Sequence, residues 1–142
     1  MGYFDENRVI RSDLLEREAL QKANSFVKHY DRYNEKTKKT EKKLAKDSLS
    51  SSQLRKFFNE FKQLEKKVGI EGFDKVKPLI KMVKSKAAYA SNPDNPKIPR
   101  SFKNFLITNL DCIEKEKDFQ AFMLHFEAVV GFFYGIEGVK NN

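Results

Sequence analysis

The sequence of 142 residues has no tryptophan, a single cysteine and only two histidines. Cys112 has no second cysteine for an intrachain disulfide and no neighbours of the metal-binding type, so we expect a reducing compartment. No stretch approaches the roughly 18 apolar residues of a membrane span, and the first residues form no apolar signal segment. These absences predict a cytoplasmic chain with no membrane partner and no metal.

Residues in patterns typical of catalytic sites are also scarce. His125 lies beside Phe126 in an aromatic stretch, and no Cys, Asp or Glu stands at metal-ligand spacing from it. The sequence contains no glycine-rich phosphate loop, no Gly-x-Ser-x-Gly turn and no His-Glu-x-x-His motif. Glu114 and Glu116 fall on different faces of a helix. We therefore expect a protein that is not an enzyme and that uses no cofactor.

Glycine and proline number only six and four, which suits long helices. Apolar residues recur at three- and four-residue steps, which predicts an all-α fold of about five helices in one compact bundle, residues 1–142. In the clearest segment Ser50 and Gln53 have the spacing of a capping box, and Gly69 is the expected stop. The five apolar stripes cover residues 15–30, 54–68, 73–87, 102–113 and 119–133.

The N-terminal part, residues 1–47, differs from the core, residues 48–142. Ser12 or Asp13 is the expected cap of a first helix, but over residues 32–46 the apolar pattern gives way to a run of lysines. This run predicts a solvated helical extension or a mobile linker, and we find no strand pattern in it. Because it offers little to fold the first helix back, we expect that helix to be extended or exchanged between protomers, and hence self-association.

The net charge of +8 is unevenly distributed. Residues 75–104 contain eight basic residues and one acid, Asp94, whereas the residues from 105 onward carry a net charge of −3. A local excess of this kind favours negatively charged partners, because it steers them and releases their counterions.

Helical geometry groups these cations into two stripes. At about 100° per residue, Lys77, Lys81 and Lys84 share one flank of the third predicted helix, and Arg55, Lys62 and Lys66 share one flank of the second. If the two helices pack side by side, the stripes line one groove for a phosphate backbone. The alternative is that each stripe only keeps the domain soluble.

Two further residues have two interpretations each. Tyr89 lies off the main apolar face, where it stacks on a base or packs on a neighbouring helix. Arg100 follows the proline-rich loop, where we expect it either to contact phosphates or to cap the carbonyls at the end of the third predicted helix.

Three segments carry a resemblance to a known family. Residues 49–55, LSSSQLR, are similar to a Leu-Thr-x-Ser-Gln-Ile-Arg helix opening, residues 86–90, KAAYA, to Lys-Leu-Ala-Tyr-Ala, and residues 126–132, FEAVVGF, to Phe-Glu-Ala-Val-Val-Ala-Tyr. In this order and spacing they resemble the small subunit of the type III-A CRISPR–Cas effector, the Csm complex. After Ala90 the sequence departs from the family, because a proline-rich loop replaces a small residue and an arginine.

The resemblance implies a helical, non-catalytic subunit of an antiviral ribonucleoprotein, stacked in several copies against the backbone of the guide–target duplex. Arg55, Lys86 and Tyr89 match its motifs. The expected partners are guide and target RNA, other subunits of the effector and further copies of this chain. The alternative function is a helical protein–protein interaction module that docks an acidic partner. The residues predicted to bind RNA are Arg55, Lys62, Lys66, Lys77, Lys81, Lys84, Lys86, Tyr89 and Arg100.

Overall fold

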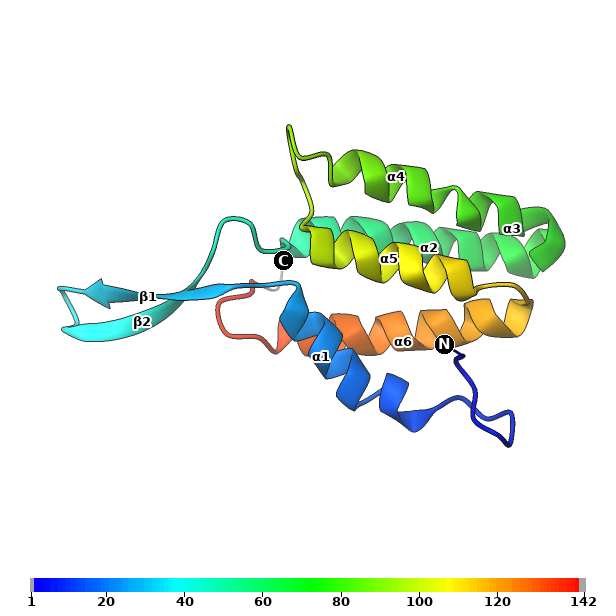
Figure 1. Ribbon diagram of the computed structural model, residues 1–142, viewed down its shortest axis with the longest axis horizontal. Helices are drawn as coiled ribbons and strands as arrows, with labels where there is room; N and C mark the ends of the chain where they lie inside the picture. The colour runs from blue at the N-terminus through cyan, green and yellow to red at the C-terminus, as the bar shows by residue number, and fades with distance from the viewer. Residues whose placement is uncertain (1, 141–142) are drawn as a thin grey trace.

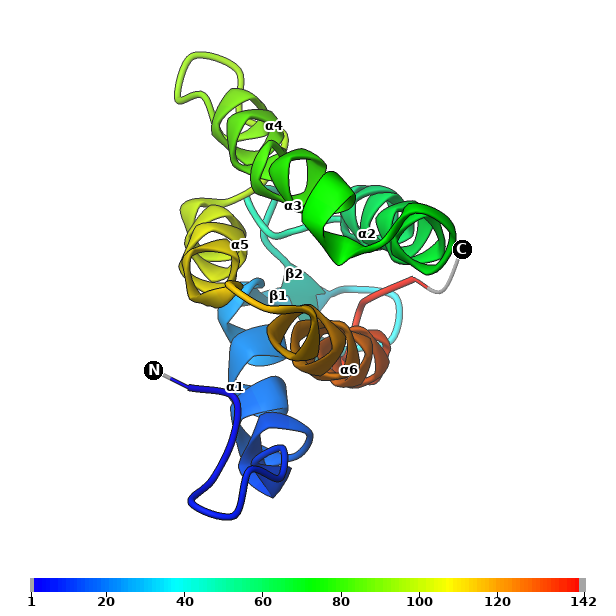
Figure 2. The same ribbon diagram turned by 90° about the vertical axis from the view of Figure 1, so that its right-hand side faces the viewer.

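A bundle of helices with one β-hairpin projecting from its end makes up the computed structural model, which describes residues 2–140 (Figure 1). Viewed end-on, α3 and α4 lie over α2 and α5 on one side, and α1 lies against α6 and α5 on the other (Figure 2). A 3₁₀ turn, Ser12–Leu14, precedes α1. The elements are α1 (Arg17–Ser25), β1 (His29–Asn34), β2 (Lys39–Leu44), α2 (Ser51–Glu71), α3 (Phe73–Lys81), α4 (Val83–Ala90), α5 (Arg100–Cys112) and α6 (Glu116–Tyr134).

Local sequence sets both ends of α2. The predicted N-cap is confirmed, since the Ser50 hydroxyl accepts a hydrogen bond from the backbone N–H of Gln53 at 3.2 Å. The predicted stop at Gly69 is wrong, because the helix continues to Glu71. It ends at Gly72, whose φ of 92° lies in the region that favours glycine.

The third predicted helix is divided into α3 and α4 at Met82. Pro78 lies four residues earlier, inside α3. A proline there removes the backbone donor to Asp74 and crowds that preceding turn. The N–H of Met82 still donates to the carbonyl of Pro78 at 3.0 Å, so the proline does not account for the break. The five predicted helices therefore correspond to the six observed ones.

Phenylalanine rings form the centre of the bundle. Phe61 on α2 and Phe122 on α6 meet edge to face with ring centroids 5.0 Å apart, the geometry that aromatic quadrupoles favour. Phe26, just after α1, meets Phe102 on α5 in the same way at 5.1 Å. All four are buried, and each such ring contributes about 1.5–3 kcal/mol when it leaves water. One continuous core thus includes residues from both the N-terminal part and the rest of the chain.

The prediction of an all-α fold is right for the bundle and wrong for residues 29–44. Strands β1 and β2 pair antiparallel in a single two-stranded ribbon, with His29 opposite Leu44 and Asn34 opposite Lys39. Their side chains are exposed on both faces for most of their length. The apolar alternation that identifies a half-buried strand is therefore missing from the sequence.

The turn of the hairpin is fixed by Asn34. Its side-chain oxygen accepts hydrogen bonds from the backbone N–H groups of Lys36 and Thr37, at 2.9 and 3.4 Å. Such an Asx turn reverses the chain without glycine. Lys38 closes it with a φ of 54°, and its N–H donates to the carbonyl of Asn34 at 2.7 Å.

The first helix is neither extended nor exchanged in this structure. It ends at Ser25 and packs on α6 of its own chain, burying Ala19 and Ala23. This contact covers only part of the apolar stripe that motivated the prediction of exchange, because Leu20 and Tyr30 stay exposed. Self-association stays a prediction, and sedimentation at several concentrations tests it.

Candidate nucleic-acid interface

The lysine stripe of α3 and α4 faces the C-terminal end of α5. The Nζ of Lys77 lies 3.2 Å from Oε2 of Glu114, and Lys84 forms an ion pair with Asp111. The acids that the local sequence lacks are therefore supplied by α5 and the turn after it. Cations at this end also complement the partial negative charge of the α5 terminus.

Lys81 lies between these two ion pairs. Its ammonium donates a hydrogen bond to the backbone carbonyl of Leu110, in the last turn of α5. Partial burial lowers the pKa of Lys81, and the neighbouring Lys84 and Lys77 act in the same direction, whereas Glu114 opposes them. Lys81 thus stabilises a helix end in the free protein.

The stripe of α2 faces the other way, toward α6. The guanidinium of Arg55 donates to the hydroxyl of Tyr134 at 3.0 Å, and its Cζ lies 5.5 Å from the centre of that ring. Lys62 pairs with Glu65 on its own helix at 3.0 Å, and this carboxylate raises the pKa of Lys62. Lys66 is exposed. The two predicted stripes do not line one groove, because one lies against α5 and the other against α6.

Two residues of the second family motif, Lys86 and Tyr89, were predicted to bind RNA. Lys86 forms an ion pair with Glu60 of α2. Tyr89 does not pack on a neighbouring helix, since 74% of its surface is exposed. The Nζ of Lys97 lies 5.8 Å from the centre of its ring, within the range of a cation–π contact.

Cations from three separate segments meet at the end of the bundle next to the hairpin. An open hollow of about 590 Å³ lies between the end of α1, the segment after β2 and the loop before α5. Lys46, Lys97 and Arg100 line it, and none of the three makes an ion pair with a residue in the range 2–140. One acid, Asp47, also lines it and is held by Lys28 at 3.1 Å.

The first turn of α5 adds to the positive character of this hollow. Helix α5 begins at Arg100, and its N-cap residue, Pro99, makes no side-chain hydrogen bond to it. The free backbone donors and the dipole of a helix N-terminus favour anions. Arg100 lies at this anion-favouring position, and within residues 2–140 its side chain makes no hydrogen bond to a carbonyl at the end of α4, the other role predicted for it. Lys46 and Lys97 were not predicted as site residues. They come together only through tertiary packing, so no pattern in the sequence marks them.

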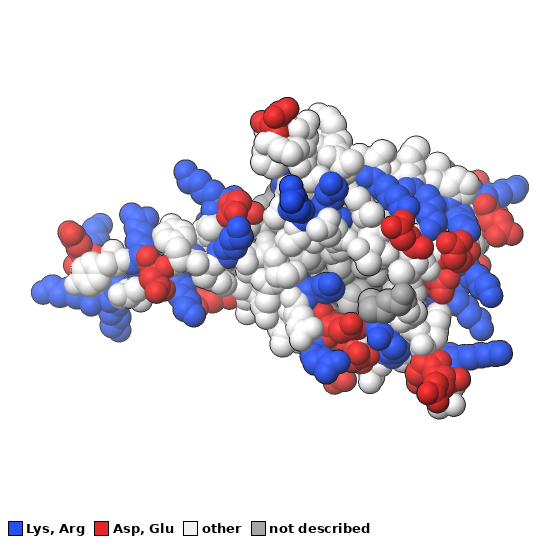
Figure 3. All heavy atoms as spheres, viewed as in Figure 1, with Lys and Arg blue, Asp and Glu red and all other residues white. Residues whose placement is uncertain are grey.

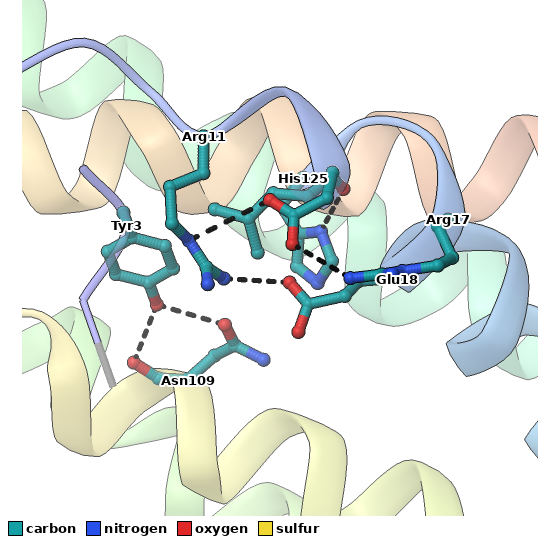
Figure 4. Close-up of polar contacts among 8 residues, drawn as sticks. Tyr3, Arg11, Arg17, Glu18, Asn109 and His125 are labelled. Atoms are coloured by element: carbon teal, nitrogen blue, oxygen red, sulfur yellow. Dashed lines mark hydrogen bonds and ion pairs between the residues drawn. The ribbon is translucent and has the colours of Figure 1, made fainter. Parts of the chain in front are cut away.

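Buried polar groups gather elsewhere, where the N-terminal segment crosses α5 and α6 (Figure 4). The Tyr3 hydroxyl bonds to the backbone carbonyl and the side-chain oxygen of Asn109, at 3.1 and 2.9 Å. His125 is 2% exposed, and its Nδ1 donates to the carbonyl of Leu14 at 2.5 Å. Burial lowers the pKa of His125 and raises that of Tyr3. These hydrogen bonds hold the N-terminal segment against the bundle.

The described part of the chain lacks both a metal-binding cluster and a membrane-spanning helix. Among residues 2–140 no three His, Cys, Asp or Glu side chains are grouped so as to hold a metal ion. Within the same residues no helix has the length and apolar character to traverse a bilayer.

These features define a small helical protein in which lysine and arginine side chains from separate segments meet at one end of the bundle. A family model, Csm2 Type III-A, matches residues 27–136 of the 142. The chain therefore belongs to the Csm2 family of type III-A systems, which confirms the resemblance carried by its three motifs. The family is a structural subunit of the Csm effector complex, so other subunits of that complex are partners. Searches of curated proteins and of solved structures found no match.

Proposed function

We propose that this chain is a non-catalytic subunit that binds the phosphate backbone of guide and target RNA in a type III-A effector. The observation that carries the proposal is the hollow in which Lys46, Lys97 and Arg100 meet without acidic partners in the described chain. Long, flexible cations beside a rigid floor suit a phosphate backbone, and such contacts are independent of base sequence. Membership of the family supplies the ribonucleoprotein context.

The nine predicted residues contribute unequally to this interface. Arg100 lines the hollow, and the exposed ring of Tyr89, a surface on which a base could stack, lies next to Lys97, which also lines it. Lys66 is exposed and available. The other cations already hold a protein partner in the free chain and must share or leave it to bind RNA: they are Arg55, Lys62, Lys77, Lys81, Lys84 and Lys86.

Binding of a single-stranded RNA of about 20 nucleotides to the full chain tests this interface. We expect Lys97→Glu combined with Arg100→Glu to weaken binding at least about tenfold, because each lost charged contact contributes about 1.5–3 kcal/mol. The matched control reverses two charges at the far end of the bundle, Lys75→Glu with Lys117→Glu, and is expected to change the affinity much less.

Two comparisons sharpen the result. Lys81→Glu with Lys84→Glu reports on the predicted stripe, and it is expected to have a smaller effect than the hollow variant since both lysines are engaged by α5. Polyglutamate as competitor represents the alternative function, an acidic protein partner. Equal RNA affinity of wild type and hollow variant, or preference for polyglutamate over RNA, contradicts the proposal.

A further inference from the structure

We propose that the hairpin β1–β2 is a second RNA-backbone contact, an arm that extends the path of a strand bound in the hollow. This inference rests on the proposed function and adds to it a surface, residues 29–44, outside the predicted site. In the structure the arm stands away from the bundle at the end where the hollow lies (Figure 1).

The arm adds little to the stability of the core. Its strands are exposed on both faces, and an isolated two-stranded ribbon is at best marginally stable in water. With six residues per strand it reaches about 20 Å. Packing in the hydrophobic core therefore does not explain which residues the arm contains.

The root of the arm is nevertheless held by three contacts. The ring of His29 donates through Nε2 to the carbonyl of Glu137 at 2.8 Å, and Leu44 packs closely over Gly138. Between the two strand ends, the N–H of Ala45 donates to the carbonyl of Lys28 at 2.7 Å. These contacts give the ribbon a defined direction relative to the hollow.

Basic side chains predominate on the arm (Figure 3). Residues 29–44 contain six basic and three acidic residues. One of the acids, Glu41, is paired within the ribbon, and a second, Asp31, lies opposite a lysine in the strand register. Asp31 lies opposite Lys42, and Glu41 accepts from Asn34 and pairs with Lys43, contacts that lower the pKa of Glu41. The lysines at the turn stay available: they are Lys36, Lys38 and Lys39.

The arm also has a concave face and exposed aromatic rings. A hollow of about 620 Å³ near the turn is lined by Tyr33, by three cations and by two acids, which are Arg32, Lys36, Lys43, Glu35 and Glu41. Tyr33 is 57% exposed and Tyr30 48%. Cations with nearby exposed aromatic rings form the combination that contacts phosphates and stacks on bases in single-stranded nucleic-acid binding.

A protein partner fits this surface less well. The only aliphatic side chain in residues 29–44 is Leu44, and it is occupied at the root. Protein interfaces are depleted in lysine and centre on buried apolar anchors. Lysines along β2 also disfavour strand addition by another chain.

Continuity with the hollow gives the arm its place in the binding path. Val27 and Lys28, which precede β1, and Lys46 and Asp47, which follow β2, all line the hollow of the bundle. An RNA strand that leaves the hollow therefore meets the base of the β-ribbon directly. RNA long enough to pass this point is expected to gain affinity from the arm, and shorter RNA is not.

Two RNA lengths, about 6 and about 20 nucleotides, separate the arm from the hollow when titrated against the full chain. The arm variant is Lys36→Glu with Lys39→Glu, and the control is again Lys75→Glu with Lys117→Glu. We expect the arm variant to bind the longer RNA about tenfold more weakly and the shorter RNA as the wild type does. Tyr33→Ala is expected to act in the same direction, and unchanged circular dichroism verifies the fold of each variant.

The outcomes for arm and hollow are distinguishable. If the arm variant loses equal affinity for both RNA lengths, or loses none for either, the arm is not an RNA contact of the proposed kind. The hollow is then tested separately by its own variant. If the arm variant loses affinity for the longer RNA and the hollow variant binds as the wild type does, the arm is an RNA contact but the path through the hollow is refuted. If the arm variant keeps full RNA affinity but fails to assemble with the other effector subunits, the arm is a protein-docking element and the inference is wrong.

Discussion

The Nζ of Lys77 on α3 lies 3.2 Å from Oε2 of Glu114, in the turn between α5 and α6. This pair joins a predicted RNA-binding lysine to an acid 37 positions away along the chain. The pairing changes how the basic stretch 75–104 is interpreted, because part of its charge is balanced within the fold.

Exchanging the two charges tests whether Lys77 acts in folding. Lys77→Glu alone places two carboxylates together and is expected to lower the free energy of unfolding by up to about 1 kcal/mol, since exposed ion pairs contribute little. The double variant Lys77→Glu, Glu114→Lys restores an opposite-charge pair and is expected to recover most of the loss in urea denaturation. A double variant that stays as unstable as the sum of its single changes would falsify the ion-pair interpretation.

The buried imidazole of His125 makes stability depend on pH. Burial lowers its pKa in the folded state, while Glu18 opposes this shift and Lys22 and Arg11 add to it. The unfolded chain then binds the additional proton, so the free energy of unfolding falls as the pH drops below the ordinary histidine value of about 6.5.

His125→Gln removes this titration while keeping an amide donor for the carbonyl of Leu14. The variant is expected to be less stable than the wild type at pH 8 and to lose less stability between pH 7 and pH 5. Thermal unfolding at a series of pH values measures both. Parallel pH profiles of the two proteins are the result that rules out His125 as the cause.

Gly138 is the closest point between the C-terminal segment and the arm. Its φ is 91°, and a Cβ added there would lie 3.2 Å from Cγ of Leu44. Gly138→Ala is therefore expected to cost about 1–2 kcal/mol and to speed hydrogen exchange at the root of the hairpin.

Gly69, in α2, provides the matched control for this substitution. A Cβ at Gly69 meets no atom within 4 Å, so Gly69→Ala is expected to stabilise the chain by about 0.5–1 kcal/mol. Equal effects of the two substitutions would contradict the close contact at the arm root.

The helices were predictable because their burial is periodic. Stripes such as Leu54, Phe57 and Phe61 mark the face of α2 that enters the core, and all three are buried. The N-cap at Ser50 was equally visible, because its effect is confined to the next three residues.

The hairpin was not predictable from periodicity. Neither face of the ribbon is buried in the core, so no apolar alternation marks it, and the turn is made by Asn34 without glycine or proline. The register depends on this turn and on contacts at the root, one of which joins His29 to Glu137, 108 positions away. Lysine-rich sequence here indicated solvent exposure and gave no information about strand pairing.

The candidate site was predictable only in part, for a related reason. Helical geometry groups residues of one predicted helix, such as Lys77 and Lys84, but it does not reveal that Asp111 and Glu114 meet them. The hollow combines Lys46, Lys97 and Arg100 from two loops and a helix start, so its members share no spacing in the sequence. Arg100 alone among these was predicted.

The most direct test of RNA-backbone binding in the hollow is the salt dependence of RNA binding by the full chain and by the Lys97→Glu, Arg100→Glu variant. For single strands the slope of log K against log salt concentration is about −0.7 per neutralised phosphate, so loss of two contacts is expected to flatten it by about 1.4. The Lys75→Glu, Lys117→Glu control is expected to keep the wild-type slope. Parallel lines for wild type and hollow variant would show that the phosphate backbone is not bound in the hollow.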